Sequence, residues 1–460
     1  MTETVKIVSP VDGRVYAERP VASAADIEAA VSRAGAARKA WGEITVRERA
    51  KFLNHFVDAL LGKNDEIVPE LAWQMGRPIR YGGERKGVEE RSRYMIDIAE
   101  AALAPAEKPG KEGFRRWIAR EPLGAVMVIA PWNYPFLTAV NSIVPALMAG
   151  NSVILKHASQ TLLVGERFAE AIVAAGLPDG LFQNLVLNHA DTEALIASGK
   201  IDHINFTGSV EGGRRIERAA AGTFATLGLE LGGKDPAYVR ADANLAHAVE
   251  NLVDGSFFNS GQSCCGVERI YVHADIYDEF VDGFVETARG WTLGNPLDPD
   301  TVVGPMAQPK FADLVRGQTL EALRKGARAH LNTRHDLDED SSPYLAPEVL
   351  TNVNHQMAVM REESFGPVVG IMKVADDDEA VTLMNDSPYG LTASIWSQDL
   401  DEAAKLGARV ETGTVYANRC DYLDPALVWT GVKDTGKGGA LSEIGYHNLT
   451  QPKSYHLKIV

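Results

Sequence analysis

The stretch from Leu123 to Leu155 contains no charged residue, and it constrains the fold more than any other feature of the sequence. It is long enough to cross a lipid bilayer. However, Pro131, Asn133 and Pro145 interrupt it, and in lipid such breaks would leave backbone groups without hydrogen-bond partners. We therefore interpret the stretch as a buried strand, loop, helix and second strand of a water-soluble α/β core, and we expect no membrane partner.

Short apolar strands alternate with helices from residue 123 onward. Strands of five or six residues separated by helices are typical of βαβ units, so the sequence predicts a doubly wound parallel sheet. The expected strands are VMVIA (126–130), SVILK (152–156), FQNLVL (182–187) and HINFT (203–207). The expected helices are 138–150, 161–176 and a stretch near 191–198.

The same alternation begins again after about residue 232. A helix is expected at 245–258, a strand at 269–273 and another helix at 277–290, and further alternation runs to about residue 420. We therefore expect a second α/β domain, with the boundary near ELGGKD (230–235). Towards the N-terminus, residues 21–60 have apolar positions at helical spacing, with Ser23 as the expected cap.

Two segments fit neither domain. FRRWIAREP (114–122) and the tail SYHLKIV (454–460) alternate polar and apolar residues, as exposed strands do. Because an unpaired edge strand invites association, both segments are candidate interface strands.

Composition excludes several classes of function. The 460 residues carry a formal net charge of −16, which argues against nucleic acid as a partner. The chain has three cysteines, of which Cys264 and Cys265 are adjacent, and this number cannot form a disulfide framework. The first residues carry charges where a signal peptide would need an apolar core. We therefore expect a cytoplasmic protein.

Two clusters of residues follow expected strands, where ligands bind in sheets of this type. In PWNYP (131–135), Asn133 is either a buried turn residue that satisfies backbone groups or a carboxamide donor for a developing oxyanion. In FTGSVEGG (206–213), the glycines Gly208 and Gly213 either form an ordinary turn or let a dinucleotide pyrophosphate approach a helix N-terminus.

Two further clusters supply a carboxylate and a thiol. TLGLELGGKDP (226–236) places Glu230 beside two glycines, where it is either a solvated side chain or a general base. SGQSCCG (260–266) places Cys264 in a loop after an expected helix, where a substrate can reach a thiol. The alternative is that Cys264 and Cys265 are small buried core residues.

The order of these clusters resembles that of the aldehyde dehydrogenase superfamily. The segments PWN, GS at a strand end, ELGGK and GQxC occur in the family's order, with Cys264 thirty-four positions after Glu230. The resemblance covers nearly the whole chain and continues in GNPLDPDTVVGPM (294–306), EESFGPVV (362–369), YGLTAS (389–394) and GVKDTGKG (431–438).

The resemblance implies an α/β architecture in three parts. A doubly wound parallel-sheet NAD(P)-binding domain would comprise residues 1–113 and 123–232. A second α/β domain, the catalytic one, would comprise 233–433, and a small β oligomerisation hairpin would comprise 114–122 and 446–460. The implied partners are a small-molecule aldehyde and further copies of the chain, as a homodimer or homotetramer.

The resemblance also assigns catalytic roles. Cys264 would attack the aldehyde to form a thiohemiacetal, and Asn133 with the Cys264 backbone N–H would stabilise its oxyanion. Hydride transfer to the cofactor would leave a thioester, and Glu230 would activate the water that hydrolyses it to the carboxylic acid. Cys265 would be structural, and no metal site is expected.

The implied cofactor is NAD or NADP. Lys156 and Glu363 would hold ribose hydroxyls, and Phe365 would pack near the nicotinamide. The residues expected to line the dinucleotide cleft are Trp132, Gly208, Ser209 and Gly213.

One departure from the family pattern concerns the choice of cofactor. Relatives restricted to NAD have a carboxylate three residues after the strand-end lysine, and this carboxylate repels a 2′-phosphate. Here the position is Ser159, with Lys156 and His157 nearby to supply positive charge. We therefore predict that NADP is accepted and that NAD is also usable.

The substrate is expected to be a short semialdehyde with a distal anionic group, because the chain length and the KxxSQT stretch (156–161) resemble those of the succinate-semialdehyde dehydrogenase branch. Arg419, in NRCDYLDPAL (418–427), is the candidate for binding that anion. Alternatively, Arg419 pairs internally with Asp421 or Asp424. The alternative function is a cofactor-independent thiol hydrolase or acyltransferase that uses Cys264, and a catalytically inactive scaffold is a third, less favoured option.

Overall fold

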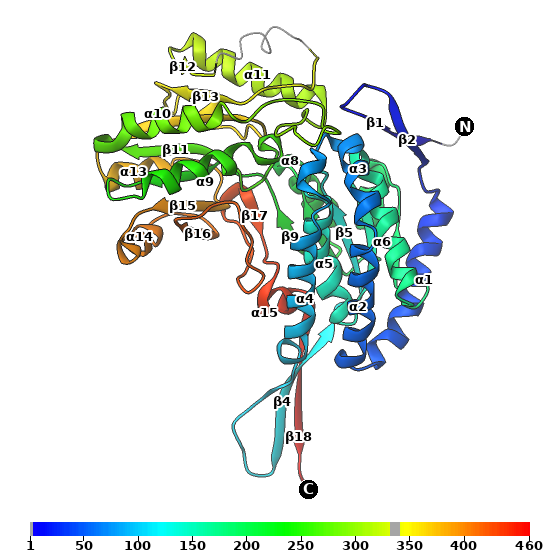
Figure 1. Cartoon of the computed structure of the whole chain (residues 1–460). Coiled ribbons are helices and arrows are strands. Elements are labelled where there is room, and N and C mark those ends of the chain that lie inside the picture. The colour runs from blue at the N-terminus through cyan, green and yellow to red at the C-terminus, as the bar shows by residue number, and fades with distance from the viewer. Residues whose placement is uncertain (1–2, 332–340) are drawn as a thin grey trace.

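The computed structural model describes residues 3–331 and 341–460, and the chain forms two large sheets, a projecting arm and an N-terminal hairpin (Figure 1). The first sheet has six strands in the order β17-β9-β8-β5-β6-β7, all parallel except β17. Its strands are β5 (Ala125–Ala130), β6 (Ser152–His157), β7 (Phe182–Asn184), β8 (His203–Thr207), β9 (Thr226–Glu230) and β17 (Gly436–Lys437).

Helices cover both faces of this sheet, because alternate residues of each strand point to opposite sides. Along β5, Val126 and Val128 join one core, whereas Met127 and Ile129 join another. The helices that contribute mainly to the first core are α2 (Val46–Leu61), α3 (Asn64–Met75), α4 (Arg85–Ala102), α5 (Pro135–Met148) and α6 (Leu162–Ala174). Those of the second core are α1 (Ala24–Glu43), α7 (His189–Ala197) and α8 (Val210–Ala220).

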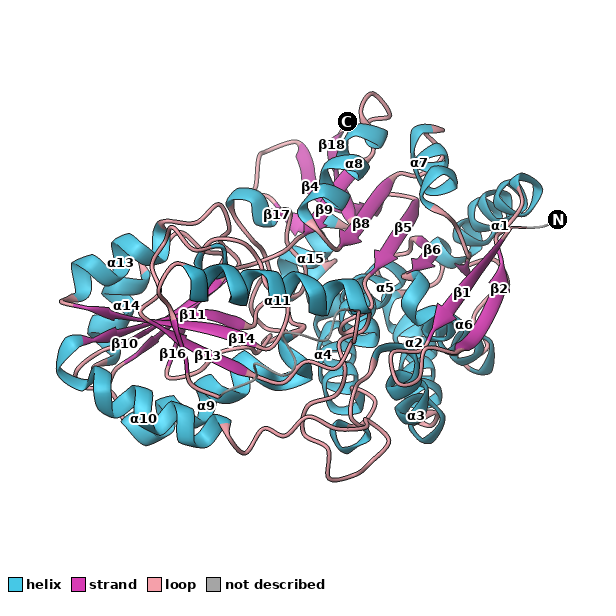
Figure 2. Cartoon of the chain, turned by 90° about the horizontal axis from the view of Figure 1, so that it is seen from above, coloured by secondary structure: helices cyan, strands magenta, loops and turns pink. Residues whose placement is uncertain are grey.

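The second sheet has seven strands in the order β12-β13-β14-β11-β10-β15-β16, parallel except for the β12–β13 pair. Its strands are β10 (Asp235–Val239), β11 (Val267–His273), β12 (Arg328–Ala329), β13 (Glu348–Thr351), β14 (Val368–Val374), β15 (Thr392–Trp396) and β16 (Thr414–Ala417). Figure 2 shows helices on both sides of it. These helices are α9 (Leu245–Phe257) and α10 (Tyr277–Ala288) on one core, and α11 (Pro309–Arg324), α13 (Asp377–Asn385) and α14 (Leu400–Gly407) on the other.

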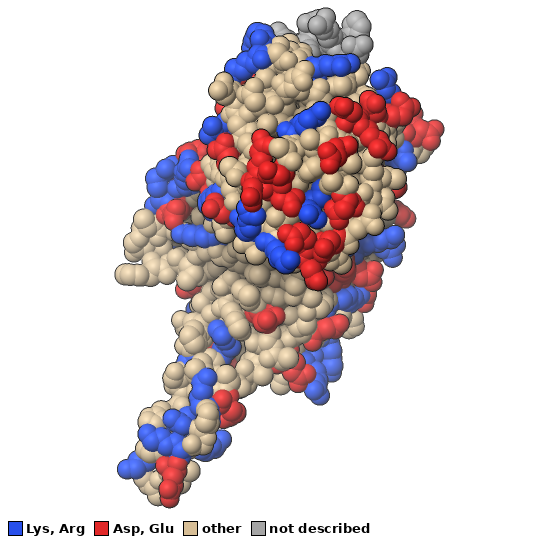
Figure 3. Space-filling view, turned by 90° about the vertical axis from the view of Figure 1, so that its left-hand side faces the viewer, with Lys and Arg blue, Asp and Glu red and all other residues tan. Residues whose placement is uncertain are grey.

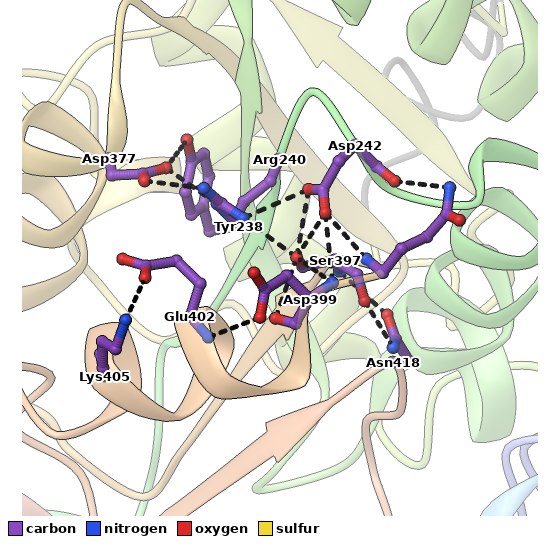
Figure 4. Close-up of polar contacts among 10 residues, drawn as sticks. Tyr238, Arg240, Asp242, Asp377, Ser397, Asp399, Glu402, Lys405 and Asn418 are labelled. Carbon is purple, nitrogen blue, oxygen red and sulfur yellow. Dashed lines mark hydrogen bonds and ion pairs between the residues drawn. The ribbon is translucent and has the colours of Figure 1, made fainter.

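Ion pairs and hydrogen bonds connect the loops and helices at the carboxyl edge of the second sheet (Figure 4). Arg240, just after β10, pairs with Asp377 at 3.1 Å and with Asp242 at 3.3 Å. Asp242 also accepts hydrogen bonds from the Ser397 hydroxyl and from the backbone N–H of Asp399, after β15. These contacts tie the loops at this edge of the sheet to one another.

A three-stranded sheet projects from the body as an arm. In it, β4 (Phe114–Pro122) lies between β3 (Ala106–Glu107) and β18 (Thr450–Lys458), which follows α15 (Ser442–Asn448). Figure 3 shows basic side chains gathered at the end of the arm, whereas acidic and basic side chains alternate over the upper body. A separate hairpin, β1 (Thr4–Val8) and β2 (Val15–Pro20), begins the chain.

The predicted α/β fold and most of its elements are confirmed, with two corrections. The helical stretch 21–60 is two helices, because Ile44 is extended and Thr45 begins α2 with a capping box to Glu48. The strand expected at 182–187 ends at Asn184. The segments expected as interface strands, 114–122 and 454–460, lie in β4 and β18 and pair with each other, and their role as an interface stays a prediction.

The uncharged stretch 123–155 forms β5, α5 and β6, as predicted. Among the described residues, no helix is both long and apolar enough to cross a membrane.

Candidate active site

The candidate site lies where the carboxyl edge of the first sheet meets the amino edge of the second. Asn133 follows β5 and Glu230 ends β9, whereas Cys264 precedes β11 and Phe365 precedes β14. The strand order of the first sheet reverses between β5 and β8, and open α/β sheets bind ligands outside the carboxyl ends of strands at such a point. The two sheets therefore bring together residues that are far apart in the sequence.

Two glycines in the crossing between the sheets allow this close approach. A Cβ atom on Gly233 would lie 2.3 Å from the carbonyl oxygen of Cys264, and one on Gly232 would lie 2.5 Å from the carboxylate of Glu363. Neither position has room for a side chain. The glycine pair after Glu230 therefore lets the end of β9 lie close to both the cysteine loop and the loop before β14.

The loop before Cys264 has a tightly held backbone. Asn259 and Ser260 have φ angles of 54° and 59°, in the left-handed region that costs energy for residues other than glycine. The Asn259 carboxamide donates to the carbonyls of Asn133 and Gln262, both at 3.2 Å. The Ser260 hydroxyl donates to the Gly304 carbonyl at 2.8 Å. These bonds fix the loop and leave Cys264 partly exposed.

The two adjacent cysteines lie in different surroundings. Cys265 is buried, and its Sγ donates to the carboxylate of Asp421 at 2.9 Å. The contact with Cys264, burial and the nearby charge of Asp421 raise the pKa of the Cys265 thiol well above its usual range. Cys265 is therefore held as a neutral thiol, and Cys264 is the one accessible from the cleft.

The Asn133 side chain is buried, and its amide lies beside the cysteine loop, donating to the Gln262 carbonyl at 3.2 Å. The Asn133 carbonyl accepts a hydrogen bond from Arg77 as well as the one from Asn259. Arg77 in turn forms an ion pair with Glu84, and both side chains are only 3% exposed. Arg77 and Asn259 thus hold the backbone of Asn133, and this orients its carboxamide.

Glu84 ties this arrangement to helix α5. Its second carboxylate oxygen accepts from the backbone N–H groups of Phe136 and Leu137, at 3.0 and 2.7 Å. These N–H groups belong to the first turn of α5, which has no intrahelical acceptors for them and favours a negative charge. The Arg77–Glu84 pair therefore joins the start of α5, the Asn133 loop and the cysteine loop.

Glu230 is half-buried at the end of β9, and the Thr207 hydroxyl donates to its carboxylate at 3.2 Å. Burial raises the pKa of this carboxyl group to about 7, although the Thr207 bond and the charge of Arg91 oppose the shift. Near neutral pH both the acid and the carboxylate are therefore present, as a general base requires.

Aromatic rings and a buried ion pair form the opposite wall of the cleft. The Trp132 ring stacks on Phe311 at 5.2 Å and meets Phe365 edge-on at 5.5 Å. The Phe365 backbone N–H donates to Glu268 at 2.8 Å, and Glu268 pairs with the buried Lys234 at 2.5 Å. This ion pair fixes the loop that carries Phe365.

Glu363 lies two residues earlier in that loop and accepts from the Gly233 N–H at 3.0 Å. Burial is the main cause that raises the pKa of Glu363, to about 8, and the charge of Glu268 adds to it. Glu363 is therefore largely protonated at neutral pH and can donate as well as accept a hydrogen bond.

The strand-end residues of β6 need one correction. Lys156 is buried, and desolvation lowers its pKa to about 8. His157 was expected to supply positive charge, but its ring is buried and contacts the Pro135 carbonyl at 3.2 Å and the Thr161 hydroxyl at 3.1 Å. Burial lowers the pKa of His157 to about 4, so it is neutral. Ser159 is exposed.

The glycine-rich turn after β8 is shaped largely by packing. Ser209 caps α8 by accepting from the Gly212 N–H at 3.2 Å. A Cβ atom on Gly213 would lie 2.6 Å from the Leu231 side chain, and one on Gly208 would lie 2.7 Å from the Phe206 ring. The glycines therefore let α8 approach β8 and the chain after β9 closely, and their contact with a dinucleotide stays a prediction.

Arg419 is exposed, and its guanidinium lies 3.5 Å from the centre of the Tyr422 ring. Neither Asp421 nor Asp424 is within ion-pair distance of it. The sequence analysis did not single out the residues that support the site, namely Arg77, Glu84, Asn259, Glu268 and Asp421. No local sequence pattern marks these five residues. Lys234, the partner of Glu268, does stand in a recognised motif, ELGGK.

Comparison with known proteins agrees with this geometry. The sequence model described as "Aldehyde dehydrogenase family" matches residues 1–455. The succinate-semialdehyde dehydrogenase [NADP(+)] of Deinococcus radiodurans is 33% identical over 447 residues, covering 97% of this chain and 93% of that protein.

Two solved structures are similar over almost the whole chain. Gox0499 has a TM-score of 0.94 and 31% identity, with 99% of each chain covered. The NADP-dependent glyceraldehyde-3-phosphate dehydrogenase of Bacillus halodurans C-125, solved with NADP, has a TM-score of 0.93 and 31% identity, covering 100% of this chain and 96% of that one.

The fold and its matches define the class first: a two-domain α/β oxidoreductase whose first domain has the doubly wound sheet of dinucleotide-binding proteins. Because the family model covers nearly the entire chain, and a curated relative is 33% identical over 97% of it, the chain belongs to the aldehyde dehydrogenase family.

The support of Asn133 by Arg77 predicts a positioning role. Arg77→Lys keeps a positive charge beside Glu84 but loses the planar donors that reach the Asn133 carbonyl and Asn259. We expect kcat for any aldehyde to fall about tenfold or more, with KM little changed, because the oxyanion donor loses its orientation. Steady-state kinetics measure this, and the exposed neighbour Arg80→Lys is the matched control. A fall in KM alone, or equal losses in both variants, would contradict the role.

Proposed function

We propose that the protein oxidises an aldehyde to its carboxylic acid, with Cys264 as the nucleophile and NAD or NADP as the hydride acceptor. The observation that carries this proposal is the convergence of a partly exposed cysteine, a buried carboxamide and a carboxyl group with pKa near 7 at the switch point of a doubly wound sheet. Membership of the aldehyde dehydrogenase family supports it.

The chain's own residues account for each step. Cys264, as the thiolate, attacks the carbonyl carbon, and the Asn133 carboxamide and the Cys264 backbone N–H stabilise the resulting oxyanion. When bound, NAD(P) accepts the hydride from that carbon. Glu230 then removes a proton from a water molecule, which attacks the thioester and releases Cys264 and the acid.

The residues present fit a dinucleotide. An open groove between α7 and α8 has a floor of small side chains, Ala194, Ala197 and Ala219, against which a flat base can pack. Arg215 and Glu193 pair at 2.5 Å beside it. In this arrangement Lys156 and Glu363 hold ribose hydroxyls, and Phe365 with Trp132 borders the nicotinamide.

We further propose that NADP is accepted. Ser159 offers a hydroxyl where a carboxylate would repel the 2′-phosphate, and Lys156 supplies positive charge. Desolvation and the charges of Lys156 and Arg215 lower the pKa of His189, the exposed first residue of α7, whereas Glu193 opposes the shift. The two NADP-dependent relatives described above support the assignment.

The proposed substrate is a short aldehyde with an anionic group at its far end. Two relatives are named for such aldehydes, one bearing a carboxylate and one a phosphate. Arg419, the anion ligand expected from the sequence, is exposed and stacks on the Tyr422 ring.

The arm supports a proposal of homo-oligomerisation, as a dimer or tetramer. In the part of the chain that the structure describes, β18 ends its sheet and pairs only with β4, so its outer edge offers unpaired backbone groups. Stacked rings, Trp117 on Tyr455 at 4.5 Å and Phe114 on His456 at 4.8 Å, stiffen the arm. A second copy of the chain can complete the edge.

The nucleophile is tested by comparing the two cysteines. Cys264→Ala should abolish the formation of reduced cofactor with any aldehyde, whereas Cys265→Ala should keep most of the activity because its thiol is buried on Asp421. Absorbance at 340 nm across an aldehyde panel, with NAD and with NADP, measures both. Equal losses would contradict the assignment, and thioester hydrolysis without any reduced cofactor would favour a thiol hydrolase or acyltransferase.

The role of Glu230 predicts a pH dependence. Because its pKa is about 7, the carboxylate fraction falls about tenfold per pH unit well below that value, so the thioester hydrolysis rate should rise with pH up to about 7 and then level off. Glu230→Gln should remove this rise and produce a pre-steady-state burst of reduced cofactor.

Thr207→Val gives the matched control for the pH profile. It removes the hydroxyl that donates to the Glu230 carboxylate, which favours the protonated form. The rise should therefore move to higher pH without disappearing. An unmoved profile in both variants would assign the base to another group.

The cofactor proposal is tested at Ser159. Ser159→Glu should lower the ratio of kcat/KM for NADP over that for NAD by about tenfold or more, roughly 1.4 kcal/mol, because a carboxylate repels the 2′-phosphate. Ser159→Thr, which keeps a hydroxyl and adds no charge, should leave the ratio nearly unchanged. A native enzyme that does not use NADP, or an unchanged ratio in Ser159→Glu, would contradict the proposal.

A further inference from the structure

One arginine of the cleft, Arg91, has no role in the site as described so far. It lies on α4, which packs against α5, and its Nη1 reaches the Leu137 carbonyl at 3.4 Å and the Asn141 side chain at 3.5 Å. Both of these bonds are long. Among the residues that the structure describes, no carboxylate lies within 4 Å of the Arg91 guanidinium, so most of its five N–H donors have no protein acceptor.

The residues next to Arg91 and to Cys264 contact the same loop. The loop after β16 links the two walls: Asp421 binds Cys265 and Ser263 beside the nucleophile, and the Tyr422 hydroxyl binds Glu90 at 2.5 Å, next to Arg91. Loop, helix α4 and helix α5 therefore surround the approach to Cys264.

Electrostatics place the guanidinium among the reacting groups. The charges of Cys265, Glu84, Glu230 and Cys264 all act on that of Arg91, and Arg91 in turn opposes the rise that burial causes in the pKa of Glu230 and of Asp421. Burial is the largest cause of the change in the pKa of Arg91, and it lowers that pKa. A half-buried cation without a paired anion is costly, and the cost falls when an anion binds.

The contrast with Arg419 identifies which arginine a substrate meets. Arg419 is exposed to solvent and stacks on the Tyr422 ring, whereas Arg91, on α4, is half-buried. An anion that reaches Arg91 loses more water and gains a stronger, bidentate contact.

We propose that Arg91 is a specificity-determining residue that binds the carboxylate at the far end of a short aldehyde while Cys264 attacks the other end. This inference rests on the proposed aldehyde oxidation, and it names the residue that binds the anionic end of the proposed substrate. Asn141, beside the guanidinium, supplies a neutral acceptor that orients it without competing as an anion would.

The test compares a charged and an uncharged aldehyde of similar length, succinic semialdehyde and pentanal, with saturating cofactor. In Arg91→Gln, kcat/KM should fall at least thirtyfold for succinic semialdehyde and stay within about threefold for pentanal. In Arg91→Lys, kcat/KM for succinic semialdehyde should lie between the values for the native enzyme and for Arg91→Gln. The matched control is Arg93→Gln on the same helix, whose arginine contacts Asn54 and Asp58 of α2 and faces away from the cleft; it should leave both efficiencies nearly unchanged.

A binding measurement accompanies the kinetics. Succinate should inhibit pentanal oxidation by the native enzyme, and Arg91→Gln should raise its inhibition constant about tenfold or more. Equal losses for both aldehydes, an unchanged inhibition constant, or a selective loss in Arg419→Gln instead of Arg91→Gln would overturn the inference while leaving aldehyde oxidation intact. A native protein that oxidises neither aldehyde would overturn the proposed function and this inference with it.

Discussion

The site depends on the short crossing between the two sheets. The chain leaves the first sheet at Glu230 and starts the second at Asp235, so only four residues join them. Such a link forces the carboxyl edge of one sheet against the amino edge of the other. Gly232 and Gly233 make the contact possible, since any side chain there would collide with Glu363 or with the Cys264 carbonyl. Glu230 and Cys264, the proposed general base and nucleophile, are therefore held together by backbone geometry.

Two buried ion pairs hold the walls of the cleft. Arg77 with Glu84 fixes the Asn133 loop to α5, and Lys234 with Glu268 fixes the loop of Phe365. Breaking such a pair by removing one partner typically costs about 3–5 kcal/mol, because a charge is left buried and uncompensated. Both pairs also bind backbone groups of the loops they support, which gives the loops one conformation. Orientation of the reacting groups is what this stability supplies to catalysis.

Local patterns predicted the elements well and the supporting contacts poorly. HINFT (203–207) and FRRWIAREP (114–122) form strands with the expected bounds, because alternation and apolar runs are local signals. The break at Thr45 carried a capping-box signal, Thr-x-x-Glu, that the longer helical periodicity concealed. By contrast, Arg77 meets Asn259 across 182 positions of sequence, and no spacing rule reports such a pairing. Local clusters singled out Asn133, Glu230 and Cys264, whereas their roles came from the family resemblance and remain predictions.

The cleft also shows why arginine suits the inner wall. Desolvation lowers the pKa of Lys156 to about 8, so a lysine in comparable burial begins to lose its charge near neutral pH. An arginine stays protonated under the same conditions. As the proposed base, Glu230 would pass between its acid and carboxylate forms near pH 7, and a neighbouring cation whose own charge changed there would shift that equilibrium. Because the charge of Arg91 does not change near pH 7, the titration of Glu230 is not coupled to that of Arg91. The guanidinium also stays charged, and so able to bind an anion, throughout this pH range.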